Sequence, residues 1–455
     1  MNYFRSYSLS PDAGVVAAWD SVAAAEIPSL RQIIAERGAE LFPEFVKRYS
    51  EVKSLPRSAR RALQRKLARS RELANIPAEW QRRLAYSIAG AALLLALSEA
   101  PARAGTINVG ANCSLTNAIL SANAGSNSGG CTGATTAPNT IVLPARSKQI
   151  LTSVYSNPGY SATGTPVVQS EITITGNGAS ISRSKKAPQF RLFSVGTSGD
   201  LTLNSVTLSG GSSGCCGGAI FNNGDLVINN SILSGNYGNA GGALGNNGHA
   251  VISGTTFSKN SAGYGGAIYN NGNFELDNCT ITGNTASIGG GAIFSYSNFE
   301  ISGGIISKNS APFGGAIANY AGFLHTDQTL ITGNKAFIGG GILTIGGGHF
   351  FIERSTISKN SATAAGGGIS SVYSYVYAYS STQITGNKAF GGGGVFNCGT
   401  FNLSNSSITG NSAKTAGGGV YNYLGTYMGY SCSTAFVNGG TVSGNKAKTG
   451  ADIFP

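Results

Sequence analysis

The sequence predicts an all-β protein: a right-handed parallel β-helix (a solenoid) with an N-terminal helical cap, preceded by a helical leader. Three observations predict this fold: a high Gly content, a repeat of about 25 residues, and apolar residues that alternate with polar ones inside each repeat. Of the 455 residues, 67 are Gly, and 64 of these lie in residues 105–455. This Gly content excludes a helical core for that part, and the lack of a strict three-residue period excludes collagen.

The charges divide the chain into two parts. Residues 1–104 hold 16 Lys and Arg against 10 Asp and Glu, whereas residues 105–455 hold 15 against 9. Each part therefore contributes +6 to the net charge of +12. The charge of the second part is spread thinly along the sequence, so no nucleic-acid partner is expected. No stretch reaches the roughly 20 apolar residues of a transmembrane helix, so the mature chain is not expected to span a membrane.

Residues 82–104 have the order of a secretory signal. Two Arg precede a 14-residue apolar run, and the segment ends in Ala-Arg-Ala. This order predicts cleavage between Ala104 and Gly105, with a buried helix or a short membrane anchor as the alternative. Residues 1–81 are then a basic helical extension that contacts anionic lipid or the export machinery, or that is simply solvated. Export predicts a secreted protein, or one on the bacterial cell surface or outer membrane.

From residue 201 to 455 the sequence repeats, and an Asn that follows Gly or Lys marks every unit. These anchors are Asn236, Asn260, Asn284, Asn309, Asn334, Asn360, Asn387, Asn411 and Asn445. Their spacings are 24, 24, 25, 25, 26, 27, 24 and 34 residues. A period in the twenties is typical of solenoids whose units are stable only when stacked.

The pattern inside each unit predicts short strands. Apolar residues stand three, eight and ten positions before the anchor, as Leu233, Ile228 and Leu226 do before Asn236. A Gly-rich turn and another apolar residue follow. Period-2 alternation bounded by Gly and Asn predicts three strands per coil and a triangular cross-section. We expect the anchor Asn in a left-handed turn conformation, with Asn side chains hydrogen-bonded from coil to coil. Paired Gly residues are expected to supply positive φ and close backbone approach.

Residues 113–123, CSLTNAILSAN, resemble the Cys-Ser-Leu-Arg-Glu-Ala segment that opens many secreted bacterial β-helix proteins. Cys131 and residues 139–145 resemble its continuation, and the Gly-Gly-Ala-Ile and Ser-Gly-Asn repeats are similar to those of chlamydial-type polymorphic outer membrane proteins. The resemblance covers the cap and first coils (105–200) and the Gly/Asn-rich repeats (201–455). It implies export and surface display, often adhesive, but no common chemistry. Thr116-Asn117 replace the family's Arg-Glu pair, so an electrostatic role of that pair is not carried over.

The same segment predicts a short helix. Leu115, Ala118, Ile119 and Ala122 form one apolar stripe, and Ser114 is placed to cap the helix N-terminus. We expect this helix to cover the open first coil, an edge that otherwise templates aggregation.

The seven Cys residues all lie in residues 105–455. The resemblance implies a disulfide between Cys113 and Cys131, and an exported protein permits it. Cys398 and Cys432 are placed to bridge an inserted loop. Three alternatives are open for the adjacent Cys215 and Cys216: they pair with other partners, they form a vicinal disulfide with each other, or they bind a metal. Cys279 is expected to be a buried small residue, and the odd number leaves at least one thiol free or intermolecular.

Acidic residues gather at two positions of the repeat. Nine and seven residues before the anchors stand Glu275, Asp277, Glu300, Asp327 and Glu353, together with His325. These positions flank inward residues, so five of the nine acids of residues 105–455 are expected on one outer face. Stacked carboxylates are suited to glycoside hydrolysis or to Ca²⁺ binding. The alternative is a solvated face that aids solubility. The alternating Tyr373, Tyr375, Tyr377 and Tyr379 bind a sugar or a partner, or pack between coils.

The sequence leaves three functions open. The first is an exported noncatalytic β-helix, adhesin-like or structural, that binds host, cell-surface or matrix glycans or proteins. The second is a polysaccharide lyase or glycoside hydrolase that uses the acidic face. The third is a matrix or fibre subunit that associates end to end. No metal triad is visible and no cofactor is expected, Ca²⁺ at the acidic face excepted. Ten residues follow the last anchor, so we expect export by a route other than a C-terminal translocator in this sequence.

Overall fold

A computed structural model describes residues 105–136, 138–157, 161–427, 429–432 and 439–454, together with scattered positions between 48 and 92. The chain divides into two units, residues 1–103 and 104–455. The predicted leader and signal segment, including Ala104, lie outside the described residues apart from those scattered positions. Among the described residues, no helix combines the length and the apolar character that crossing a membrane requires.

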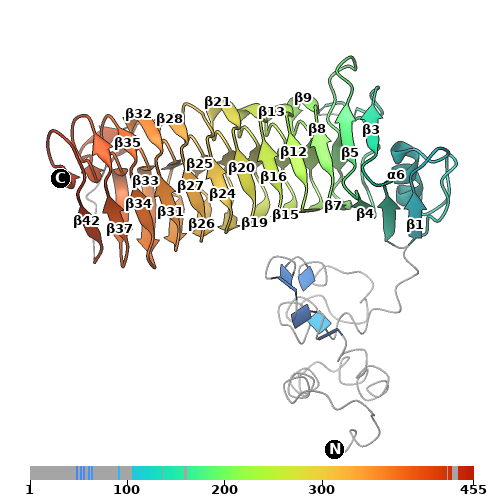
Figure 1. Cartoon of the computed structure of the whole chain (residues 1–455), viewed down its shortest axis with the longest axis horizontal. Helices are drawn as coiled ribbons and strands as arrows, with labels where there is room; N and C mark the ends of the chain where they lie inside the picture. The colour runs from blue at the N-terminus through green and yellow to red at the C-terminus, as the bar shows by residue number, and fades with distance from the viewer. Residues whose placement is uncertain are drawn as a thin grey trace, which may run out of the picture. The chain divides into compact units, whose positions relative to one another are not determined.

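Residues 105–454 form the predicted right-handed parallel β-helix, whose strands stack coil upon coil (Figure 1). The strands fall into four ladders, named A to D. Ladder A contains β1 (Gly105–Asn108), β2 (Asn139–Val142), β4 (Glu171–Thr175), β7 (Asp200–Asn204), β11 (Asp225–Asn229), β15 (His249–Ser253), β19 (Asn273–Asp277), β23 (Phe299–Ser302), β26 (Phe323–Asp327) and β30 (His349–Glu353). Ladder B contains β3 (Lys148–Leu151), β5 (Ser180–Arg183), β8 (Thr207–Ser209), β12 (Ile232–Ser234), β16 (Thr256–Ser258), β20 (Thr280–Thr282), β24 (Ile305–Ser307), β27 (Leu330–Thr332), β31 (Thr356–Ser358), β34 (Gln383–Thr385), β37 (Ser407–Thr409) and β42 (Thr441–Ser443).

Ladder C follows the anchors and has two parts. Its strands are β9 (Ser212–Cys216), β13 (Tyr237–Ala240), β17 (Ser261–Tyr264), β21 (Thr285–Gly289), then β28 (Lys335–Ile338), β32 (Ser361–Ala365), β35 (Lys388–Ala389) and β38 (Ser412–Ala413). Isolated bridges at Ser310 and Phe313 connect the two parts. Pro312 lies between those bridges and has no N–H group for a ladder hydrogen bond, which explains the missing strand.

Ladder D follows the paired Gly residues. Its strands are β6 (Phe193–Val195), β10 (Ile220–Asn222), β14 (Leu244–Asn246), β18 (Ile268–Asn270), β22 (Ile293–Ser295), β25 (Ile317–Tyr320), β29 (Ile342–Ile345), β33 (Ile369–Tyr379), β36 (Val395–Leu403), β39 (Val420–Asn422) and β43 (Ile453–Phe454). The long strands β33 and β36 continue into ladder A, because β33 pairs first with β29 and then with β30. A hairpin of β40 (Thr426–Tyr427) and β41 (Tyr430–Ser431) is inserted near the end.

The expectation of three strands per coil is wrong, because a typical coil has four, such as β11, β12, β13 and β14. The Gly-rich stretch after the anchor divides into two strands. The first Gly of each pair has positive φ, as Gly241 (73°) and Gly265 (63°) do, and this conformation turns the chain between ladders C and D. The second Gly is needed for a different reason: a Cβ on Gly242 would lie 2.2 Å from the carbonyl oxygen of Gly266 in the next coil.

The predicted inward positions form the core. Residues three before the anchors, such as Phe257 and Ile331, are fully buried, as are the alternate residues Leu226 and Ile228 of ladder A. The pattern of buried and half-buried residues in β11 is the expected period-2 alternation.

The anchor Asn side chains form one continuous internal hydrogen-bond ladder. Asn309 Nδ2 donates to Asn334 Oδ1 (3.0 Å) in the next coil and to the carbonyl oxygen of Ile281 (2.9 Å) in the preceding one. Asn334 Oδ1 also accepts from the backbone N–H of Asn309 (2.9 Å). Each anchor amide therefore uses both its donor and its acceptor atoms, which offsets the penalty of burying it. At the C-terminal end Asp452 Oδ1 accepts from the backbone N–H and Nδ2 of Asn445 (3.1 and 3.0 Å) and closes the ladder.

The expected left-handed conformation of the anchor Asn is wrong. The residue before each anchor has it instead, either a Gly such as Gly283 (φ 64°) or a Lys such as Lys308 (φ 55°). The physical reason is that this turn directs the Asn side chain into the interior, where it meets the ladder.

A second internal ladder was not expected from the sequence. Asn222 Nδ2 donates to Asn246 Oδ1, and Asn246 Nδ2 to Asn270 Oδ1, each at 2.8 Å, and Asn270 then donates to Ser295 Oγ (3.1 Å). The signal was present as an Asn three residues after the Ala of Gly-Gly-Ala, but Ser, Thr and Asn share this position along the chain.

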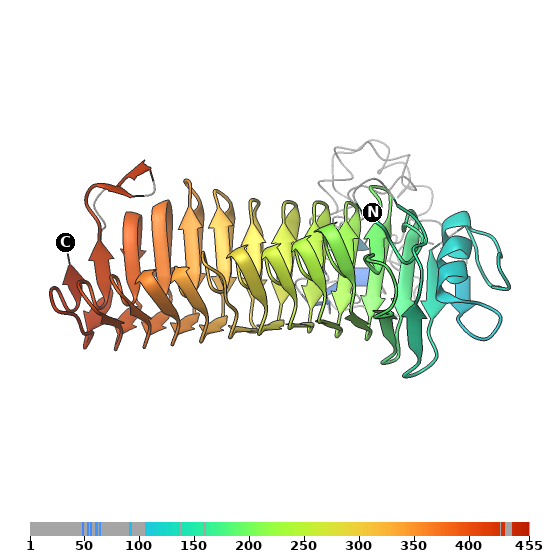
Figure 2. The same ribbon diagram turned by 90° about the horizontal axis from the view of Figure 1, so that it is seen from above.

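The predicted cap is helix α6 (Leu115–Ala124), which covers the N-terminal end of the coils (Figure 2). Ser114 is its N-cap and accepts from the backbone N–H of Asn117 (3.2 Å), as expected. The predicted apolar stripe, including Leu115 and Ile119, is buried. Asn123 Nδ2 donates to the carbonyl oxygen of Val167 (2.7 Å) and ties the helix to the solenoid.

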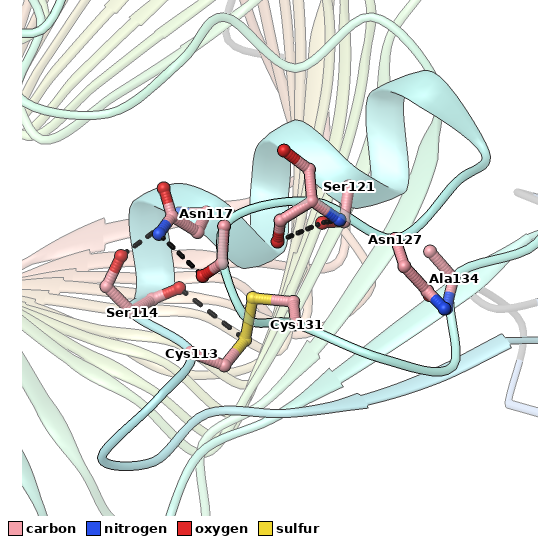
Figure 3. Close-up of a disulfide and its surroundings, with 9 residues drawn as sticks. Cys113, Ser114, Asn117, Ser121, Asn127, Cys131 and Ala134 are labelled. Atoms are coloured by element: carbon pink, nitrogen blue, oxygen red, sulfur yellow. Dashed lines mark hydrogen bonds between the residues drawn. A yellow bond between two sulfur atoms is a disulfide. The ribbon is translucent and has the colours of Figure 1, made fainter.

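The structure contains the expected disulfide between Cys113 and Cys131 beside this helix (Figure 3). The loop it closes is further held by Asn117 Nδ2, which donates to the carbonyl oxygen of Gly129 (2.9 Å). Cys398 and Cys432 form the second expected bridge, which attaches the inserted hairpin to β36. Cys215 and Cys216 form a vicinal bridge, one of the three alternatives.

Cys279 is the free thiol that the odd number requires, and it is buried. Burial raises the pKa of Cys279 to about 12, so the thiol is neutral and inert.

Candidate functional site

The outer surface of ladder A collects nearly all the acids of the β-helix. Five-residue strands of this ladder, such as β4, β7, β11 and β19, direct their first, third and fifth residues outward, where they are half-buried or exposed. Eight of the nine acids of residues 105–455 lie here: Glu171, Asp200, Asp225, Glu275, Asp277, Glu300, Asp327 and Glu353. The ninth, Asp452, closes the internal Asn ladder. Five of these acids were predicted on this face from their positions nine and seven residues before an anchor. The other three were not, because Asp225 stands 11 residues before its anchor and Glu171 and Asp200 lie before the first anchored unit.

All three His residues of the chain lie on the same face, namely His249, His325 and His349. Three side-chain groups lie along it, and the last two of them share strands β26 and β30. The N-terminal acidic group is Glu171, Asp200 and Asp225 with His249; the central acidic group is Glu275, Asp277, Glu300, His325, Asp327 and Glu353; and the aromatic group is Phe323, His349, Phe351, Tyr375 and Tyr377.

The central acidic group is built in register across successive strands. Glu275 lies opposite Glu300, and Glu300 opposite His325, in one column of outward residues. Asp327 lies opposite Glu353 in the next column. The structure thus brings the five predicted acids together over β19, β23, β26 and β30. The sequence predicted this arrangement because the acids keep a constant distance from the anchors.

His325 stands between two carboxylates. Its Nδ1 lies 3.3 Å from Glu300 Oε1 and its Nε2 lies 3.7 Å from Glu353 Oε2. The hydrogen bond with Glu300 raises the pKa of His325, and the charges of Glu300, Asp327 and Glu353 add to this while partial burial opposes it. A protonated His325 therefore neutralises part of the acidic column.

Arg354 pairs with Asp327 and also with Glu353. Its guanidinium donates to Asp327 Oδ2 (2.7 Å) and to Glu353 Oε1 (2.5 Å). Arg354 was not predicted from the sequence as part of this group, because it lies six residues before its anchor, in a turn with φ 43°, rather than on the strand. Asp327 keeps one buried oxygen, Oδ1, without a hydrogen-bond partner. Burial and the charges of Glu353 and Asp327 raise the pKa of the neighbouring Tyr379.

The remaining acids of the central group have other contacts. Asn278 Nδ2 donates to Asp277 Oδ1 (3.0 Å). In the N-terminal acidic group, His249 Nδ1 lies 3.2 Å from Asp225 Oδ1. Among the residues that the structure describes, no group of three or more His, Cys, Asp or Glu side chains has the geometry to hold a metal ion. The expected Ca²⁺ at this face stays a prediction.

The aromatic group continues the face toward the C-terminus. His349 stacks on Tyr375 (ring centroids 4.7 Å apart) and Phe351 stacks on Tyr377 (4.9 Å), and the two rings of each pair are nearly parallel. Phe323 lies 5.2 Å from Phe351 and is 44% exposed, and Tyr375 is 42% exposed. Tyr373 leaves the alternation, because β33 has an irregular register between Val372 and Tyr375.

The face therefore offers two kinds of contact side by side. The carboxylates and His325 supply hydrogen-bond acceptors and donors, and the stacked rings supply flat apolar surface. No family model, curated protein or solved structure matches this chain.

Proposed function

We propose that this protein is an exported, noncatalytic β-helix of the adhesin-like kind, and that the ladder A face binds a glycan. The observation that carries the proposal is the position of the aromatic group directly beside the central acidic group, on strands that pair in register. Sugar rings present apolar C–H faces that stack on aromatic rings and hydroxyl groups that hydrogen-bond with carboxylates. A flat sheet face suits an extended chain of such rings.

Two features support export. Three disulfides are typical of proteins that mature in an oxidising compartment. The segment 82–104 has the order of a secretory signal, and residues 113–123 resemble the opening segment of secreted bacterial β-helix proteins. We place the protein among surface-displayed or secreted proteins on these grounds.

The internal pairing of the acids supports binding over catalysis. Asp327 and Glu353 form ion pairs with Arg354, and Glu300 lies within hydrogen-bond distance of His325, so all three carboxylates already have partners within the protein. Glycoside hydrolysis needs one carboxyl group that is free to give a proton and a second that either attacks the sugar or activates a water molecule. The unpartnered Oδ1 of Asp327 is the one feature that favours the alternative, a polysaccharide lyase or hydrolase.

End-to-end assembly into fibres has less support. Helix α6 covers the N-terminal coil, and Asp452 closes the anchor ladder at the other end. Sedimentation of the mature chain at high concentration tests this third function.

Binding of cello-, manno- and chito-oligosaccharides to the wild type and to Phe351→Ala/Tyr377→Ala tests the proposal. We expect the double variant to lose about tenfold or more in affinity for the oligosaccharide that binds. The matched control is Tyr237→Ala/Phe337→Ala, which removes two exposed rings of ladder C (48% and 54% exposed) and is expected to bind as the wild type does. Equal losses in both variants would contradict the proposal. If the wild type degrades an oligosaccharide and Asp327→Asn does not, the protein is a polysaccharide-degrading enzyme instead.

A further inference from the structure

Six lysines line the corner of the solenoid at the anchor Asn residues, between ladders B and C. This lysine stripe consists of Lys259, Lys308, Lys335, Lys359, Lys388 and Lys446, each directly before or after an anchor. All six are exposed, and among the described residues none of them takes part in an ion pair. The charge that is spread thinly in the sequence is therefore gathered along one corner in the structure.

The lysines alternate from side to side along four consecutive coils. Lys308 precedes its anchor, Lys335 follows, Lys359 precedes and Lys388 follows. In the column after the anchors, Ser310, Lys335, Ser361, Lys388, Ser412 and Lys446 pair in register, so Lys and Ser take turns. Lysines on the same side are therefore two coils, or about 10 Å, apart. Because each of the four coils contributes one lysine, one positive charge stands about every 5 Å along the corner.

Three of these lysines occupy a backbone position that disfavours them. Lys259, Lys308 and Lys359 have φ of 54° to 55°, whereas the same position in the other coils is Gly. A non-Gly residue costs about 1 kcal/mol or more in this conformation. Local strain of this kind is typical of positions retained for function rather than for folding.

Hydroxyl groups run beside the lysines. The residue two before the anchor, at the end of each ladder B strand, is Ser or Thr in all nine units: Ser234, Ser258, Thr282, Ser307, Thr332, Ser358, Thr385, Thr409 and Ser443. Some of these hydroxyls bond from coil to coil, as Ser358 Oγ does to Thr332 Oγ1 (3.1 Å). The corner therefore presents cations with a continuous row of neutral hydrogen-bonding groups.

From this arrangement we infer that the lysine stripe is a second binding surface, and that its ligand is an extended acidic polysaccharide. Such a chain carries one carboxylate per sugar or per disaccharide, and in a β-1,4-linked chain successive sugars turn to opposite sides. This matches the alternating lysines, and the sugar hydroxyls match the Ser/Thr row. The inference does not rest on the proposed glycan site of ladder A, because the two surfaces share no residue.

The experiment measures binding of polymannuronate, a β-1,4-linked acidic chain, with neutral β-1,4-mannan as the comparison polymer. We expect the wild type to bind polymannuronate but not mannan, with affinity that falls as salt is added. The variant Lys308→Gln/Lys335→Gln/Lys359→Gln/Lys388→Gln is expected to bind about tenfold to a hundredfold more weakly. The control Arg146→Gln/Lys148→Gln/Lys185→Gln/Lys186→Gln removes the same charge from exposed positions in the first coils and is expected to bind as the wild type does.

A second variant separates the arrangement from the total charge. Ser310→Lys/Lys335→Ser keeps six lysines but places two on one coil and none on the next. We expect affinity for polymannuronate between those of the wild type and the quadruple Gln variant. Wild-type affinity in this variant, equal losses in the control, or tighter binding of single-stranded DNA than of polymannuronate would each overturn the inference. So would self-association that the quadruple variant abolishes, since the acidic face of a second copy would then be the partner.

Discussion

The same coils carry two very different ladders, one inside and one outside. Inside, the anchor Asn recurs in nine successive coils from Asn236 to Asn445, is buried and has its amide donors and acceptor satisfied by the neighbouring coils. Outside, ladder A changes from coil to coil, from Glu300 to His325 to Phe351 in one column. A position that repeats without variation is required by the stacking of the solenoid, whereas a position that varies is available for recognition.

Replacement of an anchor inside the stack should have the largest effect on stability. Asn334→Ala removes the acceptor of Asn309 Nδ2 and of the Asn309 N–H, and leaves the carbonyl oxygen of Ile306 without its donor. Because each unsatisfied buried group costs about 1–3 kcal/mol, we expect a loss of about 3 kcal/mol or more in the free energy of unfolding. Urea denaturation followed by circular dichroism measures it. The exposed Asn273→Ala on ladder A should change stability by less than about 0.5 kcal/mol, and similar losses in both variants would remove the distinction between inside and outside.

A similar comparison can be made between two glycines: Gly291, which belongs to a Gly pair and faces the next coil, and Gly283, which lies in the turn before an anchor. A Cβ on Gly291 would lie 2.1 Å from the carbonyl oxygen of Gly315, so Gly291→Ala must separate two coils and should cost about 3 kcal/mol. Gly283 has φ 64° but open space around a Cβ, so Gly283→Ala should cost only about 1 kcal/mol. Thermal unfolding of the two variants checks the order, and the reverse order would show that turn conformation matters more than coil contact.

Loss of His325 should have a smaller, pH-dependent effect. The folded-state pKa of His325 is raised by Glu300, so its stabilising contribution is fully present below the unfolded pKa of about 6.5 and is lost as pH rises through the folded pKa. His325→Gln should therefore lose more stability at pH 5 than at pH 9. The difference should stay below about 1 kcal/mol, because the side chains are partly solvated. A pH-independent loss would indicate a packing role instead, and high salt should reduce the effect.

The smallest expected effect is a gain. Lys308→Gly replaces a side chain in the left-handed region with the residue that adopts it freely, and should raise the free energy of unfolding by about 0.5 kcal/mol. The same change at the exposed Lys335, which does not have positive φ, should lower it. Urea midpoints of both variants show whether the lysines at positive φ lower the stability of the fold.

Much of the fold followed from the sequence, because the repeat is regular. The recurrence of Asn334 and its equivalents about every 25 residues, the apolar residues three positions earlier and the Gly pairs indicate a stack of short strands. The cap helix follows from Ser114 and its apolar stripe. The number of strands per coil could not be predicted from the sequence, because a Gly pair predicts one turn whether or not a strand lies on each side of it.

The candidate site was predicted in part for the same reason. Glu275, Asp277, Glu300, Asp327 and Glu353 share fixed distances from the anchors, so the sequence placed them on one face. Arg354 and the alternation of the lysines were not found, because they depend on which side of a turn a residue occupies and on which coils become neighbours.

The sequence by itself determined the period, the inward residues and the outer face that holds the acids, since these depend only on alternation within one unit. Only the tertiary structure decided which charges meet. The stacking of coils brings Arg354 to Asp327, places His325 between two carboxylates and gathers lysines far apart in the chain into one corner. Contacts between residues 25 positions apart require the register of whole coils, and that register is set by the buried Asn ladder and the backbone of the Gly pairs.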